Sequence, residues 1–260
     1  MTDIDSDELE PEPGDSDRGE DLHVPDGPDM TDDFALGEVP ASLLKSALAM
    51  VRDVLHSQAA VGDLKTYYDM SSDYAGRTFL DGSEVTAMDF TAADLFAVSL
   101  LRVTVRPGAA RLLLDSGPKR DELIALLTAI PPNLGLAAAE TSTYAAMALL
   151  YTNVKATLGT NPWVTASKLC ARKRPRLFPI RDKRVRMFLG LYRYGNYTID
   201  WQVFSHVMRQ PDVVDRLAEL KEDAERERDG RVSLDPNPLR HLDVLLWMEA
   251  RRQGIGGAVR

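Results

Sequence analysis

Apolar residues recur at intervals of three and four along most of this chain, which is the spacing of one face of an α-helix. In residues 118–132 the positions i, i+3, i+4 and i+7 are apolar: Leu123, Leu126, Leu127 and Ile130. Pro118 opens this stretch, as a first helical turn allows, and Pro131 ends it. A chain with this pattern buries helical faces against one another, so we expect a compact, multi-helix, all-α fold.

The same periodicity predicts a series of further helices. The first runs from Pro40 to about Ala60, and another begins after the cap-like sequence Thr91-Ala-Ala-Asp94. Pro107 is typical of one more first turn. Later helices are expected at about residues 137–157, 162–173, 183–193, 199–209, 212–228 and 237–252. Residues 70–90 alternate too weakly to assign, which leaves a short hairpin open there.

The first forty residues differ in composition from the rest. They hold fifteen Asp and Glu against one basic residue, Arg18, and few large apolar side chains. Such a segment buries too little surface to offset the entropy lost on ordering, so we expect residues 1–40 to be a disordered acidic tail. Residues 41–254 then form a single helical domain. The tail is either a solubilising segment or a screen that competes with polyanions for the basic segment described below.

Composition and motifs argue against several classes of protein. The single cysteine, Cys170, permits no internal disulfide, and no signal peptide opens the chain, so we expect a cytoplasmic protein. Since no apolar run reaches the length of a membrane span, no membrane association is predicted. The four histidines are scattered, and phosphate-loop and dinucleotide fingerprints are missing, so we predict neither a metal nor a cofactor.

The chemically most distinctive segment runs from Lys168 to Arg193. It contains ten Lys and Arg, with Asp182 as its only acidic residue. Because so dense a run of one sign repels itself, we expect an anion to lie across it, and phosphate matches arginine bidentately. The segment therefore predicts nucleic-acid contacts through eight side chains: Lys168, Arg172, Lys173, Arg174, Arg176, Lys183, Arg184 and Arg186. The alternative is that these charges solvate helix faces or pair with acids elsewhere in the chain.

Aromatic residues lie at or beside the ends of this segment. Five of them are candidates for stacking on bases: Trp163, Tyr192, Tyr194, Tyr197 and Trp201. Tyr192 also shares a helical stripe with Val185 and Phe188, which is typical of core packing. The aromatic signal is therefore weaker than the charge signal.

Residues 165–185, TASKLCARKRPRLFPIRDKRV, resemble the signature of an uncharacterised actinobacterial domain family, and LRHLDVLLWM at 239–248 is similar to the same family. The window more remotely resembles the helix-hairpin-helix DNA glycosylases. Four residues match the start of that family's second hairpin helix: Thr165, Ala166, Lys168 and Leu169. Four more match the segment that carries its catalytic aspartate: Pro179, Ile180, Asp182 and Val185. In place of the family's Gly-x-Gly turn, this chain has Gly159-Thr-Asn-Pro162-Trp163.

The glycosylase resemblance implies a fold of that type, with damaged or modified DNA as the partner. Asp182 would lie at a helix start facing a cleft, stabilise the oxocarbenium-like sugar of a flipped nucleotide and orient water. The alternative for Asp182 is an ordinary helix N-cap, and the two roles are compatible. Nothing in the sequence around Lys168 indicates desolvation, so we predict a phosphate contact or a solvated position for it and not a Schiff-base lysine.

Three functions stay open at this point. The first is a base-excision enzyme centred on Asp182. The second is a DNA-binding module of the same shape without the chemistry. The third is a protein-interaction module whose basic segment meets an acidic partner, for which residues 1–40 of the chain itself are one candidate.

Overall fold

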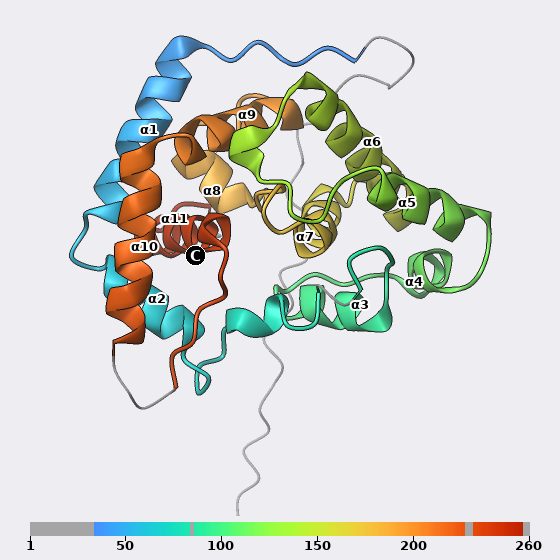
Figure 1. Cartoon of the computed structure of the whole chain (residues 1–260), viewed down its shortest axis with the longest axis horizontal. Coiled ribbons are helices and arrows are strands. Elements are labelled where there is room, and N and C mark those ends of the chain that lie inside the picture. Colours follow the sequence, from blue (N-terminus) through green and yellow to red (C-terminus); the bar gives the residue numbers. More distant parts are fainter. Residues whose placement is uncertain (1–33, 84–85, 227–230, 257–260) are drawn as a thin grey trace, which may run out of the picture.

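The computed structural model describes residues 34–83, 86–226 and 231–256, and every regular element within these ranges is helical (Figure 1). The predicted all-α class is therefore confirmed. The α-helices are α1 Ala41–Leu55, α2 Ala60–Tyr68, α3 Ala92–Ser99, α4 Pro107–Leu114, α5 Pro118–Thr128, α6 Thr141–Leu158, α7 Trp163–Lys173, α8 Lys183–Phe188, α9 Tyr197–Met208, α10 Pro211–Glu225 and α11 Pro238–Arg252. Two 3₁₀ turns, η1 Gly76–Phe79 and η2 Leu136–Ala138, lie in the connections.

Local signals account for many of the helix starts. Proline occupies the first turn of α4, α5, α10 and α11, where its missing N–H is not needed. The Thr91–Asp94 capping box forms as predicted, and the Thr91 backbone N–H donates to Asp94 Oδ2 at 2.8 Å. Asn196 and Asn237 cap α9 and α11 by accepting a hydrogen bond from a first-turn backbone N–H.

Three predicted elements differ from the structure. The helix expected from Pro40 to about Ala60 ends at Leu55, and α2 begins at Ala60 after a turn. The helix expected at 183–193 ends at Phe188, because Gly190 adopts φ 71° and the Arg186 carbonyl accepts hydrogen bonds from the N–H groups of Leu191 and Tyr192. The hairpin left open at 70–90 does not form in the described part of that stretch. Turns and η1 occupy it instead, held by Arg172, whose guanidinium donates to the carbonyls of Phe79 and Asp81.

The acidic tail falls largely in residues 1–33, outside the described residues. Residues 34–40 had been included in it, and here the expectation of disorder is wrong. They run as extended chain against α9, where the Gly37 N–H donates to Thr198 Oγ1 at 3.0 Å and Gln202 donates to the Gly37 carbonyl at 2.8 Å. Phe34 and Leu36 pack against the core, and their apolar burial favours an ordered position for this stretch.

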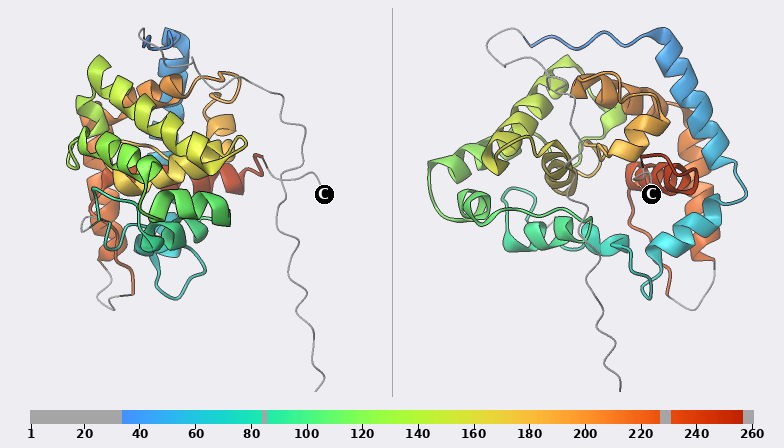
Figure 2. Two further views of the ribbon diagram at one scale, coloured as in Figure 1. Left: turned by 90° about the vertical axis from the view of Figure 1, so that its right-hand side faces the viewer. Right: turned by 180° about the vertical axis from the view of Figure 1, so that it is seen from behind.

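The helices are arranged in two groups with α7 between them (Figures 1 and 2). α1, α2, α10 and α11 pack on one another at one end, whereas α4, α5 and α6 pack together at the other. α7 contacts both α3 and α6, α8 packs on α11, and α9 packs on α1. One continuous apolar cluster connects both groups, from Leu43 to Ala250. None of the described helices is long and apolar enough to cross a bilayer.

Candidate functional site around Asp182

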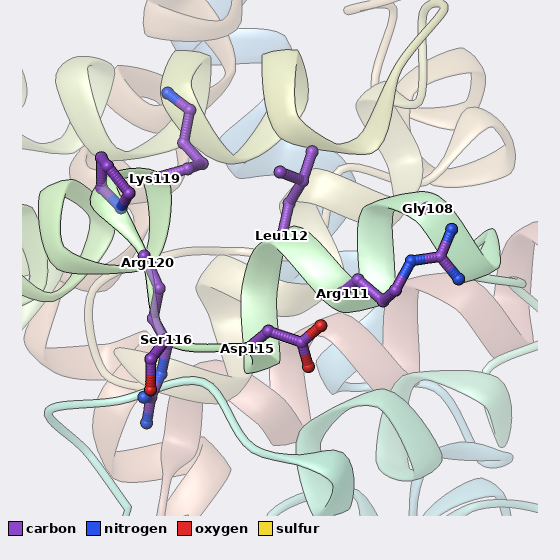
Figure 3. A pocket seen from close by; sticks show the side chains of 9 residues that line it. Gly108, Arg111, Leu112, Asp115, Ser116, Lys119 and Arg120 are labelled. Carbon is purple, nitrogen blue, oxygen red and sulfur yellow. The ribbon is translucent and has the colours of Figure 1, made fainter.

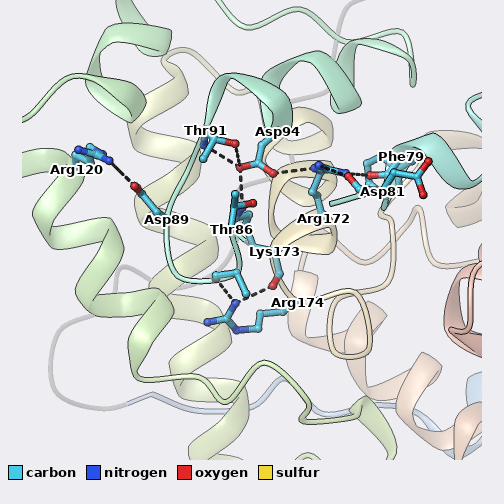
Figure 4. Close-up of polar contacts among 11 residues, drawn as sticks. Phe79, Asp81, Thr86, Asp89, Thr91, Asp94, Arg120, Arg172, Lys173 and Arg174 are labelled. Atoms are coloured by element: carbon cyan, nitrogen blue, oxygen red, sulfur yellow. Dashed lines mark hydrogen bonds and ion pairs between the residues drawn. The ribbon is translucent and has the colours of Figure 1, made fainter. Parts of the chain in front are cut away.

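The charges at the end of α7 converge on a buried carboxylate from α3 (Figure 4). Asp94 is fully buried, and its Oδ1 accepts a hydrogen bond from Arg172 Nε at 2.8 Å, while Oδ2 accepts one from Lys173 Nζ at 2.6 Å. Arg172 and Lys173 are each only 1% exposed. These two cations are therefore paired inside the protein and are not available to a phosphate.

Arg174 is also buried, and among the described residues its partners are mainly backbone carbonyls. Its guanidinium donates to backbone carbonyls, at 2.9 Å to Ile130 and at 2.6 Å to Ala87, and also to that of Leu127. Because burial removes water from the guanidinium, the pKa of Arg174 falls to about 10. Arg174 thus joins the carboxyl end of α5 to α7, at the helix terminus where a positive charge is favoured.

Arg181 and Arg186 share a second buried carboxylate. Arg181 Nε donates to Asp200 Oδ2 at 2.7 Å, and Arg186 Nε lies 2.8 Å from the same oxygen. The Arg181 guanidinium also lies over the rings of Trp163 and Tyr197, at 5.3 and 5.8 Å from their centroids. Tyr197 and Trp201 are fully buried, so the prediction that these two stack on bases is wrong.

The eight side chains predicted to bind nucleic acid therefore do not form one exposed face, and that expectation is corrected here. Five are buried: Lys168, Arg172, Lys173, Arg174 and Arg186. Arg176 is exposed, while Lys183 and Arg184 are partly exposed. The physical reason is that carboxylates and carbonyls from distant segments neutralise the buried cations, as when Asp94 meets Arg172 across 78 residues of chain.

Asp182 lies at the start of α8 and is partly exposed. Its Oδ1 accepts a hydrogen bond from the Arg184 backbone N–H at 2.8 Å, which is the N-cap interaction that the sequence suggested as one of two roles. The α6–α7 connection precedes it in the chain: Gly159 and Asn161 adopt φ 106° and 44°, which lets α7 fold back along α6. The structure thus contains two helices joined by a short turn, followed by a loop that ends at an acidic N-cap.

Lys168 of α7 is one of the predicted residues whose environment is opposite to the expectation. It is 7% exposed, and its Nζ donates to the Leu101 carbonyl at 2.7 Å. Burial lowers the pKa of Lys168 to about 8, against a smaller opposing effect from the Asp182 carboxylate. The prediction that Lys168 is not desolvated is wrong. The amine and the Asp182 carboxylate act on each other electrostatically.

A third charged group lies near this pair, on α11. Asp243 is buried beside Arg240, whose Nη2 lies 2.7 Å from Asp243 Oδ2. Burial raises the pKa of Asp243 to about 7, against the opposing effects of Arg240 and of the Ile180 N–H, while the Asp182 charge raises it further. No pattern in the sequence signalled this group, because Asp243 occurs in an otherwise ordinary amphipathic helix.

A separate hollow of about 600 Å³ lies at the α4–α5 connection (Figure 3). Its lining includes Arg111, Lys119 and Arg120, none of which was predicted as a site residue. Lys119 pairs with Glu122 at 2.6 Å, and Arg120 pairs with Asp89. Across the part of the chain that the structure describes, no group of three or more His, Cys, Asp or Glu side chains is placed to hold a metal ion.

The chain was compared with models of known protein families. A model described as "Family of unknown function (DUF6308)" matches residues 60–250. The chain belongs to this family. The DUF6308 match runs from α2 into α11 and so includes Lys168, Asp182 and Asp243, and it confirms the resemblance to an uncharacterised family. Searches of curated proteins and of solved structures found no match.

Proposed function

We propose that this protein binds DNA and cleaves the glycosidic bond of a damaged or modified nucleotide, with Asp182 as the catalytic carboxylate. The observation that supports the proposal is the position of Asp182: it is the partly exposed N-cap of α8, and it follows the α6–α7 helix pair that carries the buried Lys168. The helix-hairpin-helix glycosylase-like arrangement that the sequence resemblance implies is part of this proposal.

The chemistry requires an ionised carboxylate beside the sugar. As the bond from C1′ to the base breaks, the base leaves with the electron pair and positive charge develops on the sugar ring, which Asp182 stabilises. Water then adds to C1′ and gives its proton to the carboxylate. The first-turn N–H of Arg184, which donates to Asp182 Oδ1 at 2.8 Å, holds the carboxylate at the start of α8.

DNA binding would rest on fewer charges than the sequence predicted. Arg176 is exposed, Lys183 and Arg184 are partly exposed, and residues 159–161 of the α6–α7 turn are exposed. Arg184 also donates to the Ile255 carbonyl at 2.7 Å. Each neutralised phosphate steepens the fall of DNA affinity with salt concentration. We expect the slope that corresponds to about two to three phosphate contacts.

The decisive experiment is base release by the full-length Asp182→Asn variant. Asparagine caps helices as well as aspartate, so the variant keeps the bond to the Arg184 N–H and its folding, but it loses the negative charge. We expect single-turnover base release from duplexes with modified bases to fall by roughly 10²- to 10⁴-fold, with DNA affinity retained. Asp212→Asn, which alters an exposed carboxylate on α10, is the control and should release base at the wild-type rate.

A non-catalytic DNA-binding module is the second candidate, and the N-cap bond favours it because it explains Asp182 without any reaction. In that case the wild-type protein would bind duplex DNA and release no base from any substrate in the panel. That result would overturn the catalytic proposal.

A further inference from the structure

The loop that leads to Asp182 is held from two sides by side chains. From α7, Ser167 Oγ accepts a hydrogen bond from the Arg181 N–H at 2.8 Å and donates one to the Pro179 carbonyl at 3.3 Å. From α11, Asp243 Oδ2 accepts from the Ile180 N–H at 3.1 Å, and Arg240 Nη2 donates to the Phe178 carbonyl at 2.5 Å. Each residue from 178 to 181 thus has a backbone group bonded to a side chain of α7 or α11.

We call these side-chain contacts to residues 178–181 the clamp. Burying its α11 members, Arg240 and Asp243, costs free energy of solvation. Arg240 and Asp243 are 3% and 6% exposed, and a buried ion pair is often no more stable than apolar residues of similar volume. Within the described residues, Asp243 Oδ1 and both Arg240 Nε and Nη1 have no hydrogen-bond partner. Global stability therefore gives a poor account of this pair, whereas its bonds to the loop backbone give a direct one.

The clamp holds the backbone directly before Asp182. Ile180, whose N–H donates a hydrogen bond to Asp243, lies two residues before Asp182. The next N–H, of Arg181, donates to Ser167. Because trans peptide units are planar, a fixed Ile180–Arg181 backbone restricts the direction in which the Asp182 side chain leaves the chain. α11 thereby contributes to the site without touching a substrate.

We propose that Asp243, with Arg240, is a positioning residue that holds the 178–181 backbone and so orients the Asp182 carboxylate. The catalytic meaning of this orientation rests on the proposed function, but the clamp itself is a statement about the loop and can be measured alone. It predicts a local effect on residues 180–184 when Asp243 is altered.

The test is amide hydrogen exchange, measured by NMR on full-length wild-type, Asp243→Ala and Asp243→Asn proteins. In Asp243→Ala the Ile180 N–H loses its acceptor, so its exchange should accelerate by about tenfold or more relative to amides of α6. The Arg184 N–H, which Asp182 accepts, should also exchange faster. Asp243→Asn keeps an acceptor oxygen but no charge. The exchange rate of the Ile180 N–H in this variant should lie between those in the wild type and in Asp243→Ala. Asp212→Asn is the control and should leave both amides unchanged.

If the Ile180 and Arg184 amides exchange at the wild-type rate in Asp243→Ala, the proposed clamp is overturned. If Asp243→Ala does not fold, wild-type exchange rates in Asp243→Asn overturn it equally. Where base release is observed, kcat should fall roughly tenfold in Asp243→Ala with little change in KM, and partial recovery is expected in Asp243→Asn. Faster loop exchange with an unaltered kcat would refute the positioning role. Faster loop exchange in a protein that never releases base would refute the proposed function and leave the clamp standing.

Discussion

The buried cations in and directly after α7 differ in their hydrogen-bond partners and in their pKa values. Arg172 and Lys173 share the Asp94 carboxylate, whereas Arg174 donates to the carbonyls of Ile130, Ala87 and Leu127, and burial lowers the pKa of Arg174 to about 10. Lys168, one turn earlier, has a single carbonyl partner and an even lower pKa, about 8. A guanidinium spreads its charge over five donors and stays protonated, while an ammonium with one partner titrates more readily.

The titration of Lys168 gives a prediction with a definite sign. The pKa of about 8 in the folded state lies below the ordinary value of 10.5, so the unfolded chain binds more protons between these pH values. The free energy of unfolding of the wild type should therefore rise relative to Lys168→Met as the pH increases from 8 to 10.5, by up to about 3 kcal/mol. Urea unfolding at pH 7 and pH 10 measures this, and parallel pH profiles would contradict it.

At the scale of elements, the connections between helices place stricter demands on backbone conformation than the helices do. The turn between α6 and α7 depends on Gly159, which adopts φ 106° and ψ −140°, a region that side chains with a Cβ rarely enter. The Arg186 carbonyl and Gly190 end α8 after six residues. Gly159 thus shapes the turn that leads into α7, which carries Lys168, and Gly190 marks where α8 ends.

Gly159→Ala is expected to lower the free energy of unfolding by about 1–3 kcal/mol. A Cβ at Gly159 meets nothing within 4 Å, so the cost comes from backbone strain alone and not from a clash. Gly108→Ala is the matched control: its Cβ also meets open space, but the residue lies inside α4, so the change should be neutral or stabilising by about 0.5 kcal/mol. Urea denaturation compares the two, and equal effects would disprove the role of φ at Gly159.

Across the whole molecule, buried ion pairs connect segments that are far apart in the sequence. Asp94 ties α3 to α7, and Asp200 ties α9 to the 181–186 region. The basic segment is thus mainly an internal scaffold for the described fold. This arrangement also removes most of the exposed charge that an acidic protein partner would need.

Removal of the Asp94 charge should therefore affect the whole fold. Asp94→Asn leaves Arg172 and Lys173 buried without a counter-charge and should lower the free energy of unfolding by about 3–5 kcal/mol. The exposed pair of Arg52 and Asp212 provides the comparison, since Asp212→Asn should cost about 1 kcal/mol or less. Chemical denaturation of both variants tests this, and a small effect of Asp94→Asn would mean that water reaches the pair.

The sequence alone determined the helical class and most helix starts, because prolines, caps and apolar spacing act within a few residues of one another. Pro107, Pro118 and the Thr91–Asp94 box needed no distant partner to be interpreted. Only the tertiary structure decided which charges are buried. Whether Arg172 faces solvent depends on Asp94, and Lys168 is buried where its Nζ meets the Leu101 carbonyl, 67 residues away in the chain. Burial is a property of packed faces, and packing joins residues that the sequence keeps apart.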